Sequence, residues 1–600
     1  AGETVNTYKF TKQGKTDLAV TANNGTKLHA NVEGITVGGI VASGTNLAFT
    51  ENTTASNINL AGSDAKLKTL TVNGNGAGDS TAIAKGYGGG LVAYSPVAAE
   101  SKNNSAANVT VNVSGDFTAV GDVLVTAMQG DKSNILADAL TATVVGYSGT
   151  IGKNTIAGST TINFAKAQLT TEGSLQANAV NTMTFGDTQE YAVKGSGYGG
   201  IVGAGATLDN TIDKTATINV KDGSTLASAG EQILEAGSTG NIVANGVIKA
   251  AGAATVANMN VGNTITVNNN INVNDNSSLK TTAANSSLSL AASDNMNLTV
   301  GGVSDIQGAA VGGNAADVTS KYNRNNSINL NKGSLASKDD LNLYAGKDAT
   351  GAVSRLEFVG EAEAYNHSGI AFGADPKLNN SIIQKNQINI SNLSNGSSVA
   401  DINMFADSGV EKIRETTITY TWLHSEGTSD YTSSNMGQKS TSVASDNFIK
   451  TDGTLTAGVQ NKQNIVIGGD NNQVVVLNPT TLAAVRKVAG QEGAVGKDGI
   501  IISLKDGQGD ALTNLTTADF TVGSFNYGAA LYQRYQDLLK LINGYSDDKT
   551  STAYLGYKAE LARTEDKLRS MNLYTSDKYD DNGNLVQLGQ VVGKVNVDYI

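Results

Sequence analysis

An aliphatic residue, an asparagine and a second apolar residue recur as a tripeptide along most of the chain. The seven copies are Ile58-Asn59-Leu60, Val111-Asn112-Val113, Ile162-Asn163-Phe164, Ile218-Asn219-Val220, Ile271-Asn272-Val273, Ile328-Asn329-Leu330 and Ile388-Asn389-Ile390. Their first residues lie 53, 51, 56, 53, 57 and 60 positions apart. A drifting period of this size, carried by strand-like segments, is typical of a stacked repeat architecture. Such repeats form a long surface and seldom converge on one reaction centre.

The composition favours a thin aliphatic core and excludes several kinds of chemistry. Apolar residues make up 39% of the 600 residues, but aromatic residues only 5% and charged residues 16%. The absence of cysteine removes disulfides, thiolate catalysis and zinc–thiolate sites together. It is common in large bacterial surface proteins, which cross the envelope unfolded. The net charge of −12 argues against nucleic acid as a partner.

The termini and the hydropathy pattern bear on location. No apolar run approaches the ~20 residues of a membrane-spanning helix, and no signal peptide is visible at the start. The chain opens at Ala1 without methionine, so we expect a mature form or an excised fragment.

Local patterns are nearly all those of β-strands. Segments such as Val109–Val113 and Ser287–Leu290 alternate apolar and small polar residues, with Asn-Gly and Asp-Gly pairs between segments. Between Val111 and Ile162 the apolar segments fall into three steps of roughly 18 residues. We therefore expect a right-handed parallel β-helix with three coils per repeat. About 26 such coils would make a rod about 125 Å long.

The tripeptide also predicts a register. Its first apolar residues, from Ile58 to Ile388, should occupy equivalent inward positions in the stack, with the second apolar residue facing the same way. The asparagines between them should face the opposite side and form hydrogen-bonded ladders. Two glycine-rich segments, Gly86–Gly90 and Gly197–Gly200, stand two periods apart and predict tight turns in the repeat rather than phosphate-binding loops.

Two segments interrupt the repeat. Glu415–Trp422 has strong alternation and carries the only tryptophan, and a Ser/Thr-rich stretch follows it, which predicts a projecting hairpin or loop. Residues 528–571 show helical periodicity and predict an αα-hairpin of two amphipathic helices. The expected organisation is a β-helix shaft at 1–414, a protruding insertion at 415–447, continued β-helix at 448–527, the αα-hairpin at 528–574 and a resumed coil at 575–600, with the chain continuing beyond it.

The Ile-Asn-Val tripeptides, the Asn- and Gly-rich alternation, the lack of cysteine and the tyrosine-rich helical segment resemble the repeat regions of large bacterial exoproteins. The nearest are filamentous-haemagglutinin-like and leukotoxin-type filamentous adhesins. This resemblance implies a right-handed β-helical shaft at the bacterial cell surface or outside the cell. It implies export by a type V route through an outer-membrane transporter, and virulence-associated adhesion to a host-cell or matrix receptor, either protein or glycan. It assigns no catalytic or binding residue.

Candidate reactive groups are sparse. The histidines His29, His367 and His424 lie far apart and have no ligand-spaced neighbour, so a metal site is not expected. The pair Asp339-Asp340 is expected at a turn, Asp547-Asp548 at a helix start, and Asp580-Asp581 beside an Asn-Gly hairpin turn. We expect no enzyme activity and no cofactor. The alternatives are a carbohydrate-active β-helix enzyme (polysaccharide lyase or hydrolase) and a phage tail-spike-like fibre.

Adhesive residues are expected where the repeat is broken, because regular coils must keep small side chains to stack. Aromatic residues carry much of the energy of protein interfaces. The candidate binding residues are therefore Tyr420 and Trp422 in the insertion, and Tyr532, Tyr535, Tyr554 and Tyr557 in the helical hairpin. For the hairpin tyrosines the alternative is that they only seal the helices against the shaft.

Overall fold

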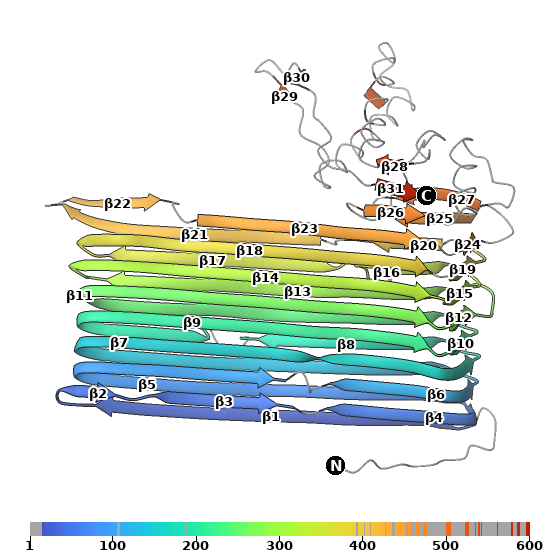
Figure 1. Ribbon diagram of the computed structural model, residues 1–600, viewed down its shortest axis with the longest axis horizontal. Coiled ribbons are helices and arrows are strands. Elements are labelled where there is room, and N and C mark those ends of the chain that lie inside the picture. Colours follow the sequence, from blue (N-terminus) through green and yellow to red (C-terminus); the bar gives the residue numbers. More distant parts are fainter. Residues whose placement is uncertain are drawn as a thin grey trace.

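Each tripeptide repeat forms one complete turn of a parallel β-solenoid in the computed structural model (Figure 1). Ile218, for example, pairs with Ile162 in the preceding coil and with Ile271 in the following one. The expected parallel β-solenoid is confirmed, but the expected coil of roughly 18 residues is wrong. The three steps of each repeat are the three sides of a single coil. Apolar and polar residues alternate in short and in long strands alike. The alternation therefore does not distinguish three short coils per repeat from one long coil with three sides.

The structure describes residues 15–457, except for short gaps, and a few segments beyond them. The gaps are at 54, 105–107, 187–189, 392–393, 401, 408–409, 426–427, 435–437 and 452–453. The further described residues are 463–468, 472–476, 500–505, 523–526, 535, 538–539, 542, 561, 578–579, 585–587 and 596–599.

A coil has two long sides and one short side, as the third coil illustrates. Strand β7 (Val123–Thr171) runs along one long side, away from the short side, and bends near Val144. It then returns through the tripeptide at Ile162 and crosses the short side from Ala167 to Thr171. We call the end where the two long sides meet directly the narrow end; the short strands of Figure 1 mark the opposite end.

The long sides contain most of the strand residues. They are β1 (Asp17–Val37), β2 (Val41–Ser43), β3 (Asn46–Asn52), β4 (Ser56–Leu67), β5 (Thr69–Asn103), β6 (Val109–Ala119), β7, β8 (Leu175–Phe185), β9 (Val193–Lys221), β11 (Gln232–Asn274), β13 (Leu288–Gln307), β14 (Val311–Asn331), β16 (Leu341–Ala345), β17 (Arg355–His367), β18 (Ile370–Ser391), β20 (Ile402–Ala406), β21 (Val410–Ser425) and β23 (Gln438–Thr451). The short side continues in β10 (Thr225–Ser228), β12 (Ser278–Thr281), β15 (Ser334–Ser337), β19 (Asn395–Ser398) and β24 (Thr454–Ala457).

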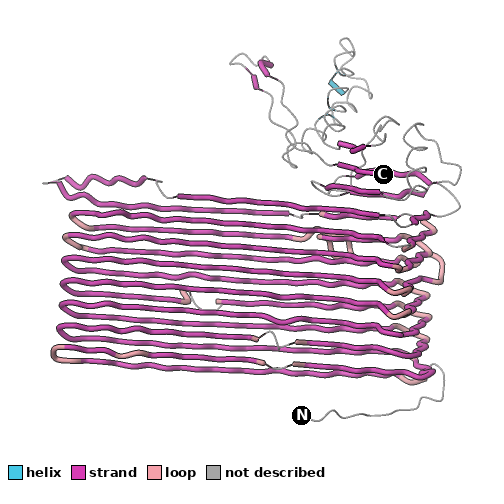
Figure 2. The backbone as a smooth tube through the Cα atoms, viewed as in Figure 1, coloured by secondary structure: helices cyan, strands magenta, loops and turns pink. Residues whose placement is uncertain are grey.

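The stack is broader than it is tall, which corrects the expected rod. One column of paired residues runs through Leu18, Leu70, Val123, Leu175, Gln232, Leu288, Leu341, Ile402, Ile465 and Ile502. At about 4.8 Å per coil these ten residues span about 43 Å. A long side such as the 21-residue β1 is about 69 Å long at ~3.3 Å per residue. The solenoid is therefore a slab of long, nearly straight strands stacked on one another (Figure 2).

The predicted register is confirmed. The first apolar residues of the seven tripeptides pair in order from Ile58 to Ile388, and all are buried. They belong to one apolar cluster beside the short side, which also contains Leu226, Leu279 and Leu335. A second apolar cluster, with Ile135, Phe185 and Met259 among its members, fills the coils towards the narrow end.

The tripeptide asparagines form the predicted outward ladder. Each amide nitrogen donates to the carbonyl oxygen of the equivalent asparagine in the preceding coil. The six hydrogen bonds are 2.7–3.0 Å long and join Asn59, Asn112, Asn163, Asn219, Asn272, Asn329 and Asn389. The ladder explains why the middle residue of the tripeptide is constant while its apolar neighbours vary.

Inward-facing positions also hold a chain of buried polar side chains, which the sequence analysis missed. Ser80, Ser101, Ser133, Asn154, Asn210, Asn263 and Ser320 are joined in that order by hydrogen bonds of 2.5–3.1 Å. Fully buried ion pairs form further polar contacts in the interior. Lys214 pairs with Asp131, and Arg324 lies 3.4 Å from Asp294. Burial is the main reason that the pKa of Lys214 is lowered and that of Tyr322, which donates to Asp294, is raised well above its usual value.

Turns fall at the corners of the coil. After the tripeptide, one or two residues in each of six coils adopt positive φ: Asp64, Gly115, Lys166, Asp222 with Gly223, Asp275 with Asn276, and Lys332. Gly90 and Gly199 occupy equivalent positions, as their pairing with Thr143 shows, and the glycine-rich segments stay within the continuous strands β5 and β9 instead of forming the predicted tight turns. A Cβ atom on Gly199 would overlap the Thr143 carbonyl oxygen, because backbones approach closely at this bend.

Strands near the C-terminus add further pairings. β25 (Gln463–Gly468), β26 (Asn472–Val476) and β27 (Ile500–Lys505) continue the parallel pairing, and β31 (Asn596–Tyr599) pairs in parallel with β26. β28 (Gly523–Asn526) pairs antiparallel with β31, and β29 (Lys578–Tyr579) with β30 (Leu585–Gln587). The predicted αα-hairpin is not seen, because most of residues 528–574 lie outside the described residues. The five residues described there, Tyr535, Leu538, Leu539, Ile542 and Leu561, are helical.

Candidate functional site

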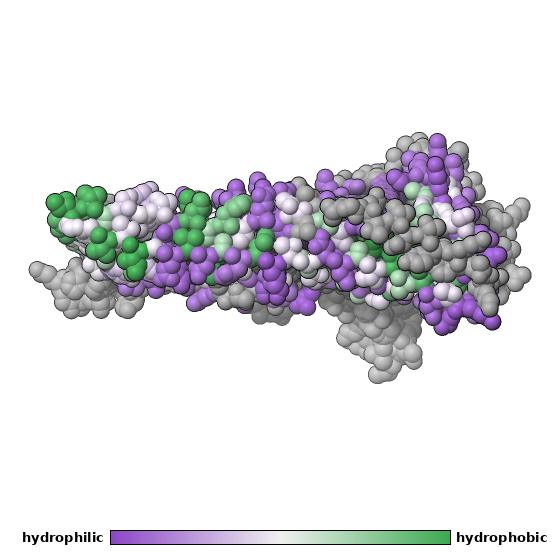
Figure 3. All heavy atoms as spheres, turned by 90° about the horizontal axis from the view of Figure 1, so that it is seen from below, coloured by the Kyte–Doolittle hydropathy of each residue, from purple (hydrophilic) through white to green (hydrophobic). Residues whose placement is uncertain are grey.

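Apolar side chains face outward on the return side of the first five coils, near the narrow end. We call this surface the apolar face. It consists of Val41, Leu47, Phe49, Val92, Tyr94, Val145, Tyr147, Ile151, Ile201 and Val256, each 41–66% exposed. Parallel pairing stacks Val41, Val92, Val145 and Ile201 in one column. Seen from below the first coil, hydrophobic residues are concentrated at the narrow end, on the left (Figure 3).

Two tyrosines form a ridge on this face. The rings of Tyr94 and Tyr147 stack with centroids 5.7 Å apart and planes inclined by 19°. Tyr147 lies against the backbone of Gly149 in its own coil and of Gly203 in the next, where an added Cβ atom would come within 2.9 Å of the ring. Glycine at these positions therefore leaves room for the Tyr147 ring.

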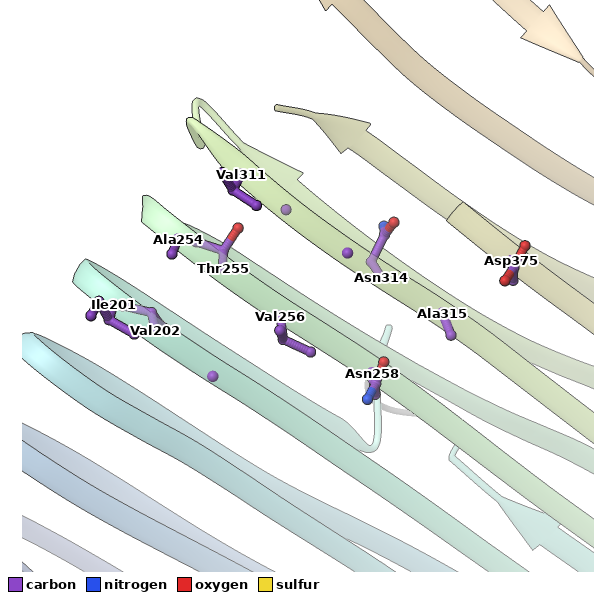
Figure 4. A pocket seen from close by; sticks show the side chains of 13 residues that line it. Ile201, Val202, Ala254, Thr255, Val256, Asn258, Val311, Asn314, Ala315 and Asp375 are labelled. Atoms are coloured by element: carbon purple, nitrogen blue, oxygen red, sulfur yellow. The ribbon is translucent and has the colours of Figure 1, made fainter. Parts of the chain in front are cut away.

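A groove of about 560 Å³ lies beside the ridge (Figure 4). Its lining includes the small residues Gly203, Ala254, Gly313 and Ala315, and the larger Ile201, Val256 and Val311. These residues come from β9, β11 and β14, which stack in register. Asn258, Asn314 and Asp375 add polar groups to the lining. In the column that holds Tyr147 in the third coil, the fourth and sixth coils have Gly203 and Gly313, and this loss of side-chain volume opens the groove.

Two ion pairs lie on the same side of the sheet, towards the short side. The Lys102 ammonium lies 3.1 Å from Glu51, and Lys153 lies 3.7 Å from Glu100. Both pairs join adjacent coils, since Glu51 pairs with Lys102 and Glu100 with Lys153 in the sheet register. In the next coil the exposed Asp209 stacks in register on Lys153 and adds a negative charge to this border.

The insertion predicted around Tyr420 and Trp422 contains an antiparallel hairpin at the narrow end (Figure 1). β21 pairs in parallel with β17 as far as Thr421, and its last residues pair with β22 (Thr428–Ser434). We call residues 419–434 the aromatic hairpin, because the register sets Trp422 opposite Tyr431 and Tyr420 next to Tyr365 of β17. Tyr365 donates to Glu363 at 3.0 Å, and burial, aided by Glu363, raises its pKa to about 12.

The other predicted binding residues are not brought together with this hairpin in the described part of the chain. Tyr535 is helical and buried, and it joins the apolar cluster beside the short side. This burial agrees with the alternative in which the helical segment seals against the solenoid. Tyr532, Tyr554 and Tyr557 lie outside the described residues.

The remaining candidates show no reactive arrangement. His29 lies within β1 and His367 at the end of β17, and the described residues contain no group of three acidic or histidine side chains placed to hold a metal ion. The predicted turn at Asp339-Asp340 is confirmed, and Asp339 accepts a hydrogen bond from Ser287 at 3.2 Å. Asp547-Asp548 and Asp580-Asp581 lie outside the described residues. No helix in the described part of the chain is long and apolar enough to cross a membrane.

The sequence also contains a signal for the apolar face. Apolar residues occupy consecutive positions at Leu91-Val92 and Val144-Val145. In a strand with one solvent-exposed face, apolar and polar residues would alternate instead. Comparison with known proteins adds no assignment, since no family model, no curated protein and no solved structure matches this chain.

Proposed function

We propose that this chain is a structural and adhesive protein of the bacterial cell surface, in which the solenoid holds the aromatic hairpin out for contact with a receptor. The supporting observation is the departure of β21 from the parallel stack. Tyr420, Trp422 and Tyr431 sit where the chain leaves the repeat, on a hairpin anchored to β17 by regular pairing. Binding residues are often found on such segments of a rigid scaffold.

The outer surface of the regular coils supports the same division of roles. In seven successive coils the outward position of the tripeptide is an asparagine that takes part in the ladder. A surface of this kind repeats from coil to coil and offers little specificity, so recognition falls to the segments that break it. The partner we propose is a host-cell or matrix receptor, protein or glycan. Export through an outer-membrane transporter belongs to the proposal through the family resemblance.

Binding to immobilised matrix proteins, glycans and cultured host cells tests the proposal. The double variant Y420A/W422A should bind at least fivefold more weakly than the wild-type protein, because aromatic residues dominate interface energies. The matched control is T428A/S433A in the same hairpin, and far-UV circular dichroism should be unchanged in both variants. Equal binding by the two double variants would place adhesion elsewhere. Release of sugars from polysaccharides by the wild-type protein would instead favour the carbohydrate-active enzyme.

A further inference from the structure

We propose that the apolar face is a self-association surface, on which two copies of this chain pack against each other about a two-fold axis. This goes beyond the adhesive role of the aromatic hairpin, which lies in later coils. The partner is a second copy because two features of the face, its area and its shape, fit such a dimer.

The area matches what a stable dimer needs. The ten side chains of the apolar face each expose about half of their surface, so covering them removes on the order of 900 Å² per copy, close to the ~800 Å² per partner of a standard interface. The largest apolar patch of a typical monomer is only ~300–600 Å². Eight of the ten residues are aliphatic or phenylalanine and have no polar side-chain atom. Such a surface suits an apolar protein face better than a sugar, whose hydroxyl groups need hydrogen-bonding partners.

The shape of the face is self-complementary. A two-fold interface uses the same patch on both subunits, so each protruding element must meet a hollow in the same patch. The Tyr94–Tyr147 ridge and the groove floored by Gly203 lie side by side, with Gly203 common to both. A two-fold axis near Ile201, between ridge and groove, seats the ridge of each copy in the groove of the other.

Sedimentation equilibrium of the full chain between roughly 1 and 100 μM tests the proposal. The wild-type protein, 61.5 kDa as a monomer, should sediment with twice that mass. Ile201→Asp places like charges at the axis and should weaken association at least tenfold. Ile383→Asp is the matched control, because Ile383 is an outward isoleucine of β18 outside the face, 38% exposed, and it should leave the dimer intact. Circular dichroism should confirm that both variants are folded.

Cysteine crosslinking gives a second measurement that does not depend on weakening the dimer. The natural chain has no cysteine, so a single introduced thiol reports only contact between copies. Ile201→Cys should form a disulfide-linked dimer under mild oxidation, and Ile383→Cys should not. A wild-type monomer at 100 μM, or equal crosslinking of the two variants, overturns the proposal. Loss of receptor or glycan binding in a monomeric Ile201→Asp protein would reassign the face to a ligand. The two proposals are tested independently. Y420A/W422A should still dimerise, and a wild-type protein that does not dimerise would leave the receptor-binding test of the aromatic hairpin unaffected.

Discussion

The buried ion pair between Lys214 and Asp131 offers a sharp test of how the solenoid interior is stabilised. Both side chains are fully buried, with Lys214 on β9 and Asp131 on β7. The lysine also donates to the Ala157 carbonyl oxygen at 3.0 Å, and Gln129 donates to the other carboxylate oxygen at 3.3 Å. Removing the lysine by the K214M substitution leaves a carboxylate in the core with one weak amide contact.

The expected loss follows from that geometry. Breaking a buried pair by removing one partner costs about 3–5 kcal/mol, because the remaining charge loses its compensation. K214M should therefore lower the free energy of unfolding by about 3–5 kcal/mol. D131N should cost less, about 1–3 kcal/mol, since burial already lowers the pKa of Lys214 and its loss of a proton removes the unpaired charge. The double variant K214M/D131N buries no charge and should be more stable than K214M.

Urea unfolding followed by far-UV circular dichroism measures these differences. K321M is the control, because Lys321 is an exposed lysine on the outer surface of β14. It should change stability by less than about 0.5 kcal/mol. If K214M behaves like K321M, or if the losses of K214M and D131N simply add in the double variant, the ion pair does not act as a unit and the reasoning fails.

Three further predictions concern the stack and its titration. Ile271→Asp should expose the coils on either side to hydrogen exchange, because each coil contacts only its neighbours, and protection that persisted there would contradict the observed register. Asn210→Ala, in the buried chain, should reduce urea stability more than Asn219→Ala in the outward ladder, since water replaces the lost hydrogen bonds only at the outer site; equal losses would argue against this. Burial, with a smaller effect of Asp340, raises the pKa of Tyr344 to about 12, so the protonated phenol stabilises the fold below pH 10 and this stability is lost between pH 10 and 12. The urea midpoint should fall across that interval, and less so in Y344F.

The register of the stack could be predicted from the sequence, but the size of the coil could not. An inward aliphatic residue and an outward Asn recur together in every tripeptide. Any solenoid that stacks successive tripeptides on one another buries the aliphatic residue and aligns the Asn side chains, whatever the length of its coil. The number of coils per repeat was inferred from the three apolar segments between Val111 and Ile162, and the Asn-Gly pairs between such segments were interpreted as turns. Asn24-Gly25 lies inside β1 and Asn245-Gly246 inside β11, where pairing with adjacent coils keeps these residues extended. Tertiary pairing therefore overrode the local turn preference.

The aromatic hairpin could be predicted from the sequence, but the apolar face could not. The aromatic hairpin was marked by strong alternation around Trp422, and an antiparallel pair is present there. The apolar face depends on stacking between coils, which brings together residues more than fifty positions apart, such as Tyr94 and Tyr147. The buried lysine was marked only by its place in the alternation, since Lys214 follows the inward Ile212 by two positions and precedes the inward Ala216 by two. A charged residue at such a position predicts a buried partner, but not which one.

The equivalence of successive coils makes the chain modular in length. Excising the coil from Leu175 to Glu231 would set Ile162 on Ile271 and Asn163 on Asn272, so the tripeptide contacts would close across the junction, although Asp131 would lose its partner Lys214. Recombination between coils can therefore shorten or lengthen the protein in steps of one repeat without requiring any new kind of contact. Relatives built on this plan should differ in length by whole coils, and tandem duplication should be an accessible route by which such a protein grows.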